Sequence, residues 1–378
     1  MKDIAKDLGI SIVTVSKVLH NHTDISPATR MRVLRRMKEL NYQPNLNAQG
    51  LASGHSYMIG LIVPDLVHAF FSEVARSLAY TIRQRGFGLL ISSSSEDPQF
   101  EQEEIALMIR RRVDVLIVAS CQPNSRSLQK AAEELPLILL DRQFSDFPTS
   151  FVGTNDVLVG ELATEHLIRT GCRRIAHIGG TMTSTSVHRL QGYMNALLRH
   201  HLPIRDEYII RRKRADEAAD KSGWQAMNRL LRLSPRPDGV FCYNDPAAVG
   251  AMNAVIAAGL RIPDDISVIG AGNIRYAESF RVPLSSVDVP STELGEHAGK
   301  LALQLAENAN PPRPRFILVQ PKLLLRESCR RESGTRGPAD PDRHDRKKDQ
   351  SRSAATRNYK RKVGVRAQDD NPGSAKEV

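Results

Sequence analysis

Seven short runs of consecutive apolar residues constrain the fold of this chain more than any other feature. Segments of about 10–17 residues with helical periodicity separate them. Short apolar strands that alternate with helices predict parallel sheets covered by helices on both faces. Seven strand–helix units are more than a single sheet readily accommodates, so the sequence predicts an α/β core of two lobes with a cleft between them. The runs occupy residues 58–63, 88–91, 113–118, 137–140, 174–179, 239–242 and 266–270.

Residues that directly follow these strands are the candidate ligand-binding residues, because ligands of such sheets bind in the crevice beyond the carboxyl ends of the strands. Phe70 has two equally suitable roles: its ring packs in the core, or it offers a flat apolar face to a sugar or ring ligand. Arg189, in a helix after a glycine-rich turn, suits hydroxyl pairs, carboxylates or phosphates, and a plain surface arginine is the alternative. Asp245 is expected to cap the next helix, to bind ligand, or to do both.

The first 44 residues predict a separate domain of short helices. Gly9 ends a first helix over residues 3–8, and Ser11 is a suitable cap for a second over residues 12–21. Two short helices joined by a glycine-containing turn are typical of a helix-turn-helix motif. The alternative is an ordinary solvated bundle. The outward side chains of the second helix are small or polar, as in a helix that enters the DNA major groove: Thr14, Ser16 and Lys17.

A third helix is expected after Ser26, its cap, with Pro27 at the favoured first position. Residues 1–50 hold eight Lys or Arg against four Asp or Glu, whereas the middle of the chain is near neutral. A basic head on a near-neutral body indicates phosphate binding at one end only. The predicted inner stripe of the third helix is Val33, Leu34, Met37 and Leu40.

A dense, ordered set of short stretches marks the amino-terminal region. It comprises Asp3-Ile4-Ala5, Gly9-Ile10-Ser11, Thr14-Val15-Ser16, Ser26-Pro27, Leu40-Asn41-Tyr42, Pro44-Asn45, and Ala48 with Leu51. This set resembles the headpiece and hinge of the lactose-repressor (LacI) family. The resemblance covers about residues 2–328. It implies a helix-turn-helix headpiece over 1–44, a hinge over 45–56 that is ordered only on DNA, and over 57–328 a two-lobed core similar to periplasmic sugar-binding proteins.

The resemblance also implies how the headpiece meets DNA. Ile12, Val13 and Lys17 would face base edges, and Leu51 would wedge into the minor groove and kink the duplex. Ile12 and Val13 carry no hydrogen-bonding groups, so they would contact thymine methyls or exclude other groups, whereas Lys17 would bond a guanine. Thr14 and Ser16 would lie nearer the phosphates. The full DNA-binding set is Ile12, Val13, Thr14, Ser16, Lys17, Asn21 and Leu51.

In the core, the resemblance implies a set of effector-binding residues, and several of its positions depart from the usual pattern. Asn155-Asp156 stands where the family usually shows Asp-Asn. Gly272 stands where an Asp often precedes the Asn, and Ala218 falls where relatives carry a ring-stacking aromatic. These departures leave the identity of the sugar-like effector open. The implied set is Phe70, Asn155, Arg189, Asp245 and Asn273.

Other functional classes lack support in the sequence. The four cysteines are scattered without a Cys-x-x-Cys pair, which favours buried thiols in a reducing cytoplasm over zinc or disulfides. The Gly-x-Gly of residues 270–272 has Arg275 at the third glycine position, which disfavours a dinucleotide site. No nucleophile elbow or Walker loop appears, so we expect no cofactor, no metal and no catalysis. A signal peptide and a membrane-spanning apolar run are also absent.

Residues 329–378 are basic and poor in apolar side chains, which predicts a disordered tail. This tail is either inert or adds nonspecific DNA affinity. The whole sequence therefore predicts a cytoplasmic transcription regulator, a repressor, controlled by a small sugar-like effector. We expect it to act as a homodimer or a tetramer on a pseudo-palindromic double-stranded DNA operator. The alternative is a solute-binding protein without gene control, which the headpiece opposes.

Overall fold

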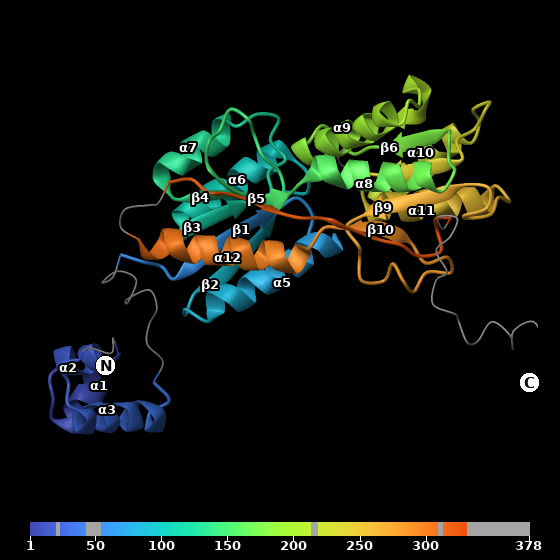
Figure 1. Cartoon of the computed structure of the whole chain (residues 1–378). Coiled ribbons are helices and arrows are strands. Elements are labelled where there is room, and N and C mark those ends of the chain that lie inside the picture. Colours follow the sequence, from blue (N-terminus) through green and yellow to red (C-terminus); the bar gives the residue numbers. More distant parts are fainter. Residues whose placement is uncertain (20–22, 43–53, 213–217, 309–312, 331–378) are drawn as a thin grey trace, which may run out of the picture. The chain divides into compact units, whose positions relative to one another are not determined.

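The computed structural model describes residues 1–19, 23–42, 54–212, 218–308 and 313–330. Most of the predicted hinge, the tail beyond Arg330, and Asn21 and Leu51 lie outside the described residues. The described residues form a headpiece and two α/β lobes (Figure 1). None of the described helices is both long enough and apolar enough to cross a bilayer.

The headpiece consists of α1 (Lys2–Leu8), α2 (Ile12–Leu19) and α3 (Pro27–Glu39). Gly9 ends α1 in the left-handed conformation, with φ at 63°, which costs a glycine little. Ser26 caps α3 through the backbone N–H of Thr29, and Pro27 occupies the first helical position, as predicted. The buried side chains of this small core are Ile4, Ala5, Val15, Val18 and Val33.

The predicted inner stripe of α3 is only half right. Val33 is fully buried and Met37 packs against the headpiece core, but Leu34 is 49% exposed and Leu40 is 41% exposed. The periodicity placed four side chains on the inner face, yet two seven- and eight-residue helices are too short to cover so wide a stripe. The headpiece therefore exposes apolar side chains on α3 as well as on α2.

The first lobe is built on a six-stranded sheet in the order β11-β5-β4-β3-β1-β2, and every neighbouring pair is parallel. Helices α5 (Ala69–Arg83) and α12 (Ser291–Glu307) cover one face, and α6 (Pro98–Arg110) and α7 (Arg126–Glu134) cover the other (Figure 1). This coverage is why the strands read as unbroken apolar runs. The strands are β1 (Met58–Val63), β2 (Gly88–Ser93), β3 (Val115–Val118), β4 (Leu137–Leu140), β5 (Ser150–Thr154) and β11 (Phe316–Val319).

The second lobe has the strand order β12-β10-β9-β8-β6-β7, with β12 antiparallel to β10 and the other pairs parallel. Its helices are α8 (Asp156–Arg169), α9 (Ser184–Arg199), α10 (Ala219–Leu230) and α11 (Asp245–Ala257), with the short 3₁₀ helix Asp206–Tyr208 before β7. The strands are β6 (Ile175–Ile178), β7 (Ile209–Ile210), β8 (Gly239–Cys242), β9 (Ser267–Ala271), β10 (Ser285–Asp288) and β12 (Lys322–Leu324).

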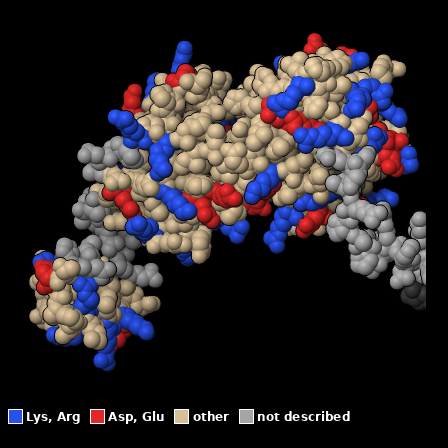
Figure 2. Space-filling model, in the orientation of Figure 1, with Lys and Arg blue, Asp and Glu red and all other residues tan. Residues whose placement is uncertain are grey.

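The predicted two-lobed parallel architecture is confirmed, and all seven apolar runs contain strands. The chain crosses between the two sheets three times: after β5, after β10 and after β11. Strands β5, β7, β10 and β11 were not predicted. β7 has only two residues, and β5 and β10 contain polar residues, whereas β11 is as long and as apolar as β4 and was overlooked. On the visible face of the core, acidic and basic side chains are intermingled, as expected from the near-neutral charge of this part of the sequence (Figure 2).

Candidate functional site

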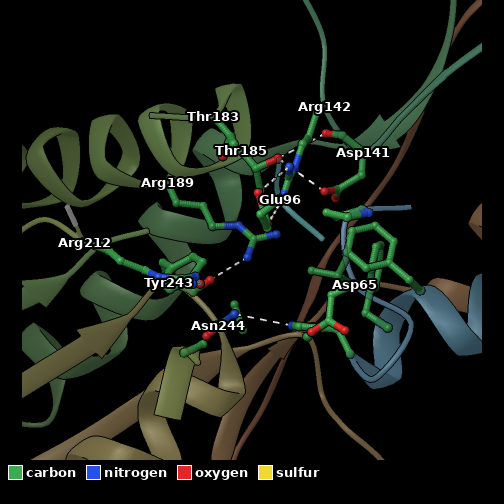
Figure 3. Close-up of a pocket in the computed structure, with 18 of the residues that line it drawn as sticks. Asp65, Glu96, Asp141, Arg142, Thr183, Thr185, Arg189, Arg212, Tyr243 and Asn244 are labelled. Atoms are coloured by element: carbon green, nitrogen blue, oxygen red, sulfur yellow. Dashed lines mark hydrogen bonds and ion pairs between the residues drawn. The ribbon is translucent and has the colours of Figure 1, made fainter. Parts of the chain in front are cut away.

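A cavity of about 370 Å³ lies where the carboxyl ends of strands from both sheets meet (Figure 3). Its first-lobe lining follows β1, β2 and β4, and its second-lobe lining follows β6 to β10. The position is the one expected for a ligand site in such sheets. The described lining residues are Pro64, Asp65, His68, Phe70, Phe71, Ser95, Glu96, Asp141, Arg142, Thr183, Thr185, Arg189, Arg212, Ala218, Ala219, Tyr243, Asn244, Ala271, Gly272 and Val289.

Arg189 of α9 reaches the cavity from the second lobe, although only 6% of the residue is exposed. Its Nε donates to Oδ1 of Asp156 at 2.8 Å, and its Nη1 donates to the carbonyl oxygen of Tyr243 at 2.5 Å. Burial raises the pKa of Asp156, and the neighbouring Arg189 opposes that rise. These two bonds fix the guanidinium in one orientation at the cavity wall.

The close packing of α8 on α9 brings these two partners together. A Cβ on Gly160 of α8 would lie 2.1 Å from the carbonyl oxygen of Arg189, and one on Gly192 of α9 would lie 2.0 Å from that of Val157. No side chain fits at either position. The two glycines therefore set the spacing that lets a side chain at the start of α8 reach the guanidinium of Arg189.

Asp141 and Arg142 enter the cavity from the loop after β4. Arg142 donates from Nη2 to Oε1 of Glu96 at 2.7 Å and from Nη1 to Oε2 at 3.2 Å, a bidentate ion pair. Thr185 of α9 donates to the carbonyl oxygen of Asp141 at 3.2 Å. Burial raises the pKa of the Asp141 carboxyl, whereas Arg189 and Arg142 lower it. Asp141 adopts φ of 61°, a left-handed conformation that Asp tolerates better than most residues.

A hydrogen bond joins the two lobes directly across the cavity. Asn244 Nδ2 lies 3.4 Å from Nε2 of His68, the residue before α5. Burial lowers the pKa of His68, so the neutral ring accepts this bond from the amide. Asn244 also caps α11, because its Oδ1 accepts from the backbone N–H of Ala247 at 2.9 Å. One side chain thus holds a helix start and contacts the opposite lobe.

Of the five predicted effector residues, the structure places Phe70 and Arg189 in the lining. Phe70 packs edge-on against Phe71 with ring centroids 5.0 Å apart, so it belongs both to the hydrophobic core and to the cavity wall. The two interpretations left open by the sequence are therefore compatible. Arg189 is not a plain surface arginine, because Asp156 holds it in a buried ion pair.

The other three predicted residues have side chains bonded elsewhere and are not among the described lining residues. Asn155 caps α8 by accepting from the N–H of Leu158 at 3.1 Å. Asn273 donates to Asp288 at 3.1 Å and accepts from Arg326 at 2.7 Å.

Asp245 is fully buried behind the lining. It accepts from the N–H of Ile274 at 2.8 Å and from the hydroxyl of Ser286 at 2.7 Å. The expectation that Asp245 caps α11 is wrong, because that role belongs to Asn244 and Asp245 is the first helical residue. Burial raises the pKa of Asp245 to about 6, against the lowering effect of these two hydrogen bonds.

Several lining residues escaped the sequence analysis. Asp141 follows a predicted strand, and Asn244 precedes Asp245 by one position, so the rule that selected Asp245 applied to both of them equally. Arg212 follows β7, a two-residue strand without a visible sequence signal.

Among the α2 side chains predicted to contact DNA, Ile12 and Val13 are exposed, whereas Thr14, Ser16 and Lys17 are half-buried. Ile12 is 43% exposed and Val13 is 64% exposed. Lys17 forms an ion pair with Asp24. The hydroxyl of Ser11 caps the helix by accepting from the N–H of Thr14 at 3.0 Å. These exposed apolar side chains suit contact with thymine methyl groups in a major groove.

The described residues contain no cluster of three or more His, Cys, Asp or Glu side chains that would hold a metal ion. All four cysteines are free; three are buried, as predicted, and Cys121 is only half-buried. Burial raises the pKa of the Cys121 thiol to about 12, so this thiol is protonated at neutral pH.

Comparison with known proteins agrees with this architecture. Residues 1–45 match bacterial regulatory proteins of the lacI family, and residues 164–329 match the periplasmic binding protein-like domain. The transcriptional repressor PurR of Mannheimia succiniciproducens is 30% identical over 334 residues, which are 88% of this chain and 98% of PurR. The ribose operon repressor of Haemophilus influenzae is 33% identical over 87% of this chain and 98% of its own length.

Solved structures show the same arrangement. The lac repressor dimer bound to operator and the anti-inducer ONPF has a TM-score of 0.75 and 26% identity, over 86% of this chain and 97% of the repressor chain. The transcriptional regulator CelR in complex with cellobiose has a TM-score of 0.66 and 27% identity, over 86% of this chain and 98% of the other. Because the relatives match both the headpiece and the two-lobed core, the chain belongs to the LacI family of bacterial transcription regulators.

Proposed function

We propose that this regulator is a repressor whose affinity for its operator is set by a small, hydroxyl-rich effector bound between the two lobes. The observation that supports this most is the cavity itself, which presents charged groups from both lobes and the amide of Asn244 beside the aromatic residues Phe70, Phe71 and Tyr243. Hydroxyl groups of a sugar both donate to carboxylates such as Asp141 and accept from groups such as Arg189 and Asn244. Binding rather than catalysis is the proposed role of this site.

The same geometry suggests how binding reaches the DNA. A ligand bonded to both walls stabilises one arrangement of the lobes, and the three crossings are the only covalent links between them in the described core. The change in operator affinity equals at most the difference in effector affinity between the two arrangements. An effector with equal affinity for the two arrangements would shift nothing.

On the DNA side, we propose a homodimer that binds a pseudo-palindromic operator, as two headpieces related by a two-fold axis require. Lys17 would bond a guanine, and Ile12 with Val13 would contact thymine methyls. Leu51 would enter the minor groove. Such a regulator would act in the cytoplasm, where the operator is.

The experiment that tests the proposal is selection of bound fragments from random duplex DNA by the purified full chain, with and without a metabolite extract. We expect a pseudo-palindromic sequence to be enriched and its occupancy to change when the extract is added. A chain that enriches no sequence under either condition would contradict the proposal.

A further inference from the structure

The chain enters the first lobe through residues 54–57, here called the entry segment, and the carboxylate of Asp114 holds this segment. Asp114 precedes β3, and only 7% of its side chain is exposed. Its Oδ1 accepts from the backbone N–H of Ser56 at 2.9 Å, and its Oδ2 accepts from that of Met58 at 3.3 Å. The ring of His55 lies beside the same carboxylate, with Nδ1 3.5 Å from Oδ1. One carboxylate thus binds the chain on both sides of Tyr57.

Tyr57, between these two bonds, has an unfavourable backbone conformation. Its φ of 55° lies in the left-handed region, which a bulky side chain rarely adopts. A residue in this region persists only where its surroundings fix it. Besides the two bonds to Asp114, the N–H of Gly88 donates to the carbonyl oxygen of Tyr57 at 2.8 Å, and the Tyr57 ring packs on Phe87 with centroids 5.5 Å apart. These contacts fix a sharp turn where the chain from the headpiece joins β1.

The second lobe has an acidic residue at the equivalent position, but it does not hold such a turn. Asp114 and Asp238 each lie one residue before the first paired residue of their strands, β3 and β8. Oδ1 of Asp238 accepts from the backbone N–H of Arg173 at 3.0 Å and from that of Arg174 at 2.9 Å. Both arginines are described, and neither has a positive φ. An acid at this position therefore joins two strand starts in each lobe, whereas Asp114 also holds a left-handed residue beside the link to the headpiece.

We propose that Asp114 is a positioning residue for operator binding, because it holds the turn at Tyr57 and so directs the link from the core to each headpiece. Asp114 lies at the amino ends of the strands, away from the cavity at their carboxyl ends. When one headpiece of a dimer is bound, the effective concentration of the other at its half-site falls if the link becomes longer or less directed. Release of the entry segment does both and leaves the headpiece itself unchanged. This inference rests on the proposed function and adds to it a residue remote from both binding sites.

The first test compares Asp114→Ala with Asp238→Ala, which removes the matching bonds in the second lobe. The full-length proteins are titrated at low ionic strength with the duplex obtained by the random-fragment selection, and with a duplex that carries only one half of it. For Asp114→Ala we expect the affinity for the full operator to fall about fivefold or more, and the affinity for the half operator to stay within about twofold. For Asp238→Ala both affinities should stay within about twofold. The midpoint of thermal unfolding should fall by similar amounts in the two variants.

The second test measures how strictly the link directs the headpieces. One base pair inserted at the centre of the selected operator separates the two half-sites and rotates one relative to the other, so the unmodified protein should bind it more weakly. A released entry segment tolerates the change, so the penalty for the insertion should be smaller in Asp114→Ala and unaltered in Asp238→Ala. Asp114→Asn keeps one acceptor oxygen but places an amide donor opposite the other N–H, so its penalty should be intermediate.

Three results would overturn the inference. They are an unaltered affinity of Asp114→Ala for the full operator, equal losses in Asp114→Ala and Asp238→Ala, and equal losses on the full and the half operator. The second result would show a loss of stability alone, and the third would show damage to the headpiece. If Asp114→Ala does not fold, Asp114→Asn is judged by the same three criteria. An unmodified protein that selects no operator contradicts the proposed function, whereas one that binds its operator supports that function whatever the variants do.

Discussion

In the headpiece, five of the seven side chains expected to contact DNA lie on one eight-residue helix, α2, and two of these, Ile12 and Val13, are exposed to solvent. In the core, the residues that line the cavity come from segments far apart in the sequence, and half of them are buried. Several are bonded to one another, such as Arg142 to Glu96 and Arg189 to Tyr243. The exposed headpiece side chains would be covered only when DNA binds, whereas the cavity side chains are already held in place by ion pairs within the protein. Substitutions should therefore affect binding alone in the headpiece, but binding and stability together in the core.

The largest effect is expected from Arg189→Ala, because it leaves the buried carboxyl of Asp156 without its ion-pair partner. Removal of one member of a buried pair costs about 3–5 kcal/mol of folding free energy. Effector binding should fall more than a hundredfold. Urea unfolding and calorimetry measure the two effects.

Arg199→Ala is the matched control for that substitution. Arg199 lies on the same helix, α9, but it is itself exposed, and its ion pairs with the half-buried Glu161 and Glu165 lie at the surface. Surface pairs contribute little, so neither stability nor effector binding should change measurably. Similar losses in both variants would contradict the distinction between the organised cavity and its surroundings.

The next largest effect concerns pH. Burial raises the pKa of Asp245 to about 6 from an ordinary value of 3.8, so the folded protein binds its proton more tightly than the unfolded chain does. The contribution of this group to stability is therefore greatest below pH 4 and falls by about 3 kcal/mol as the pH rises to above 6. Asp245→Asn removes this dependence, and an amide is able to keep both hydrogen bonds, to Ile274 and Ser286.

Urea unfolding of Asp245→Asn and the unmodified protein between pH 4.5 and 7.5 measures that difference. The variant should gain stability relative to the unmodified protein as the pH rises, and it should retain effector binding, because Asp245 lies behind the cavity wall. Loss of effector binding in a stable Asp245→Asn protein would show that this carboxyl reaches the ligand, as the sequence analysis expected.

A smaller effect is expected for Lys17→Gln, which should change DNA binding and leave the core unaffected. If Lys17 bonds a guanine, its replacement should change the preference at one symmetric base pair by about 1–3 kcal/mol and leave effector binding unaltered. Lys38→Gln, on the exposed surface of α3, is the control and should not change the base preference. Fragment selection with each variant compares them. A uniform loss across all sequences in Lys17→Gln would identify a phosphate contact instead.

The same contrast explains what could be predicted from the sequence. Apolar runs and helix caps are local signals, so the seven core strands and the caps of the headpiece were predicted from them. The residues that line the cavity depend on which strand ends meet in space. Strands β7 and β10 have too few consecutive apolar residues to be recognised as strands in the sequence. Arg212 was missed for that reason. The sequence analysis chose Asp245 and not Asn244 as the ligand-binding residue. Side chains of adjacent residues at the start of a helix point in different directions, and their order in the sequence does not show which of them faces the cavity.

The smallest effect separates the two roles of Asn244. Asn244→Ala removes the cap of α11 and should cost about 1 kcal/mol, whereas Asn244→Ser keeps a capping oxygen and should cost only a few tenths. Both substitutions remove the amide that donates to His68 across the cavity, so both should weaken the operator response to effector to the same extent. Urea unfolding gives the first quantity, and operator binding with and without effector gives the second. A serine variant with an unaltered response would show that the cap, and not the contact between the lobes, is what the effector needs.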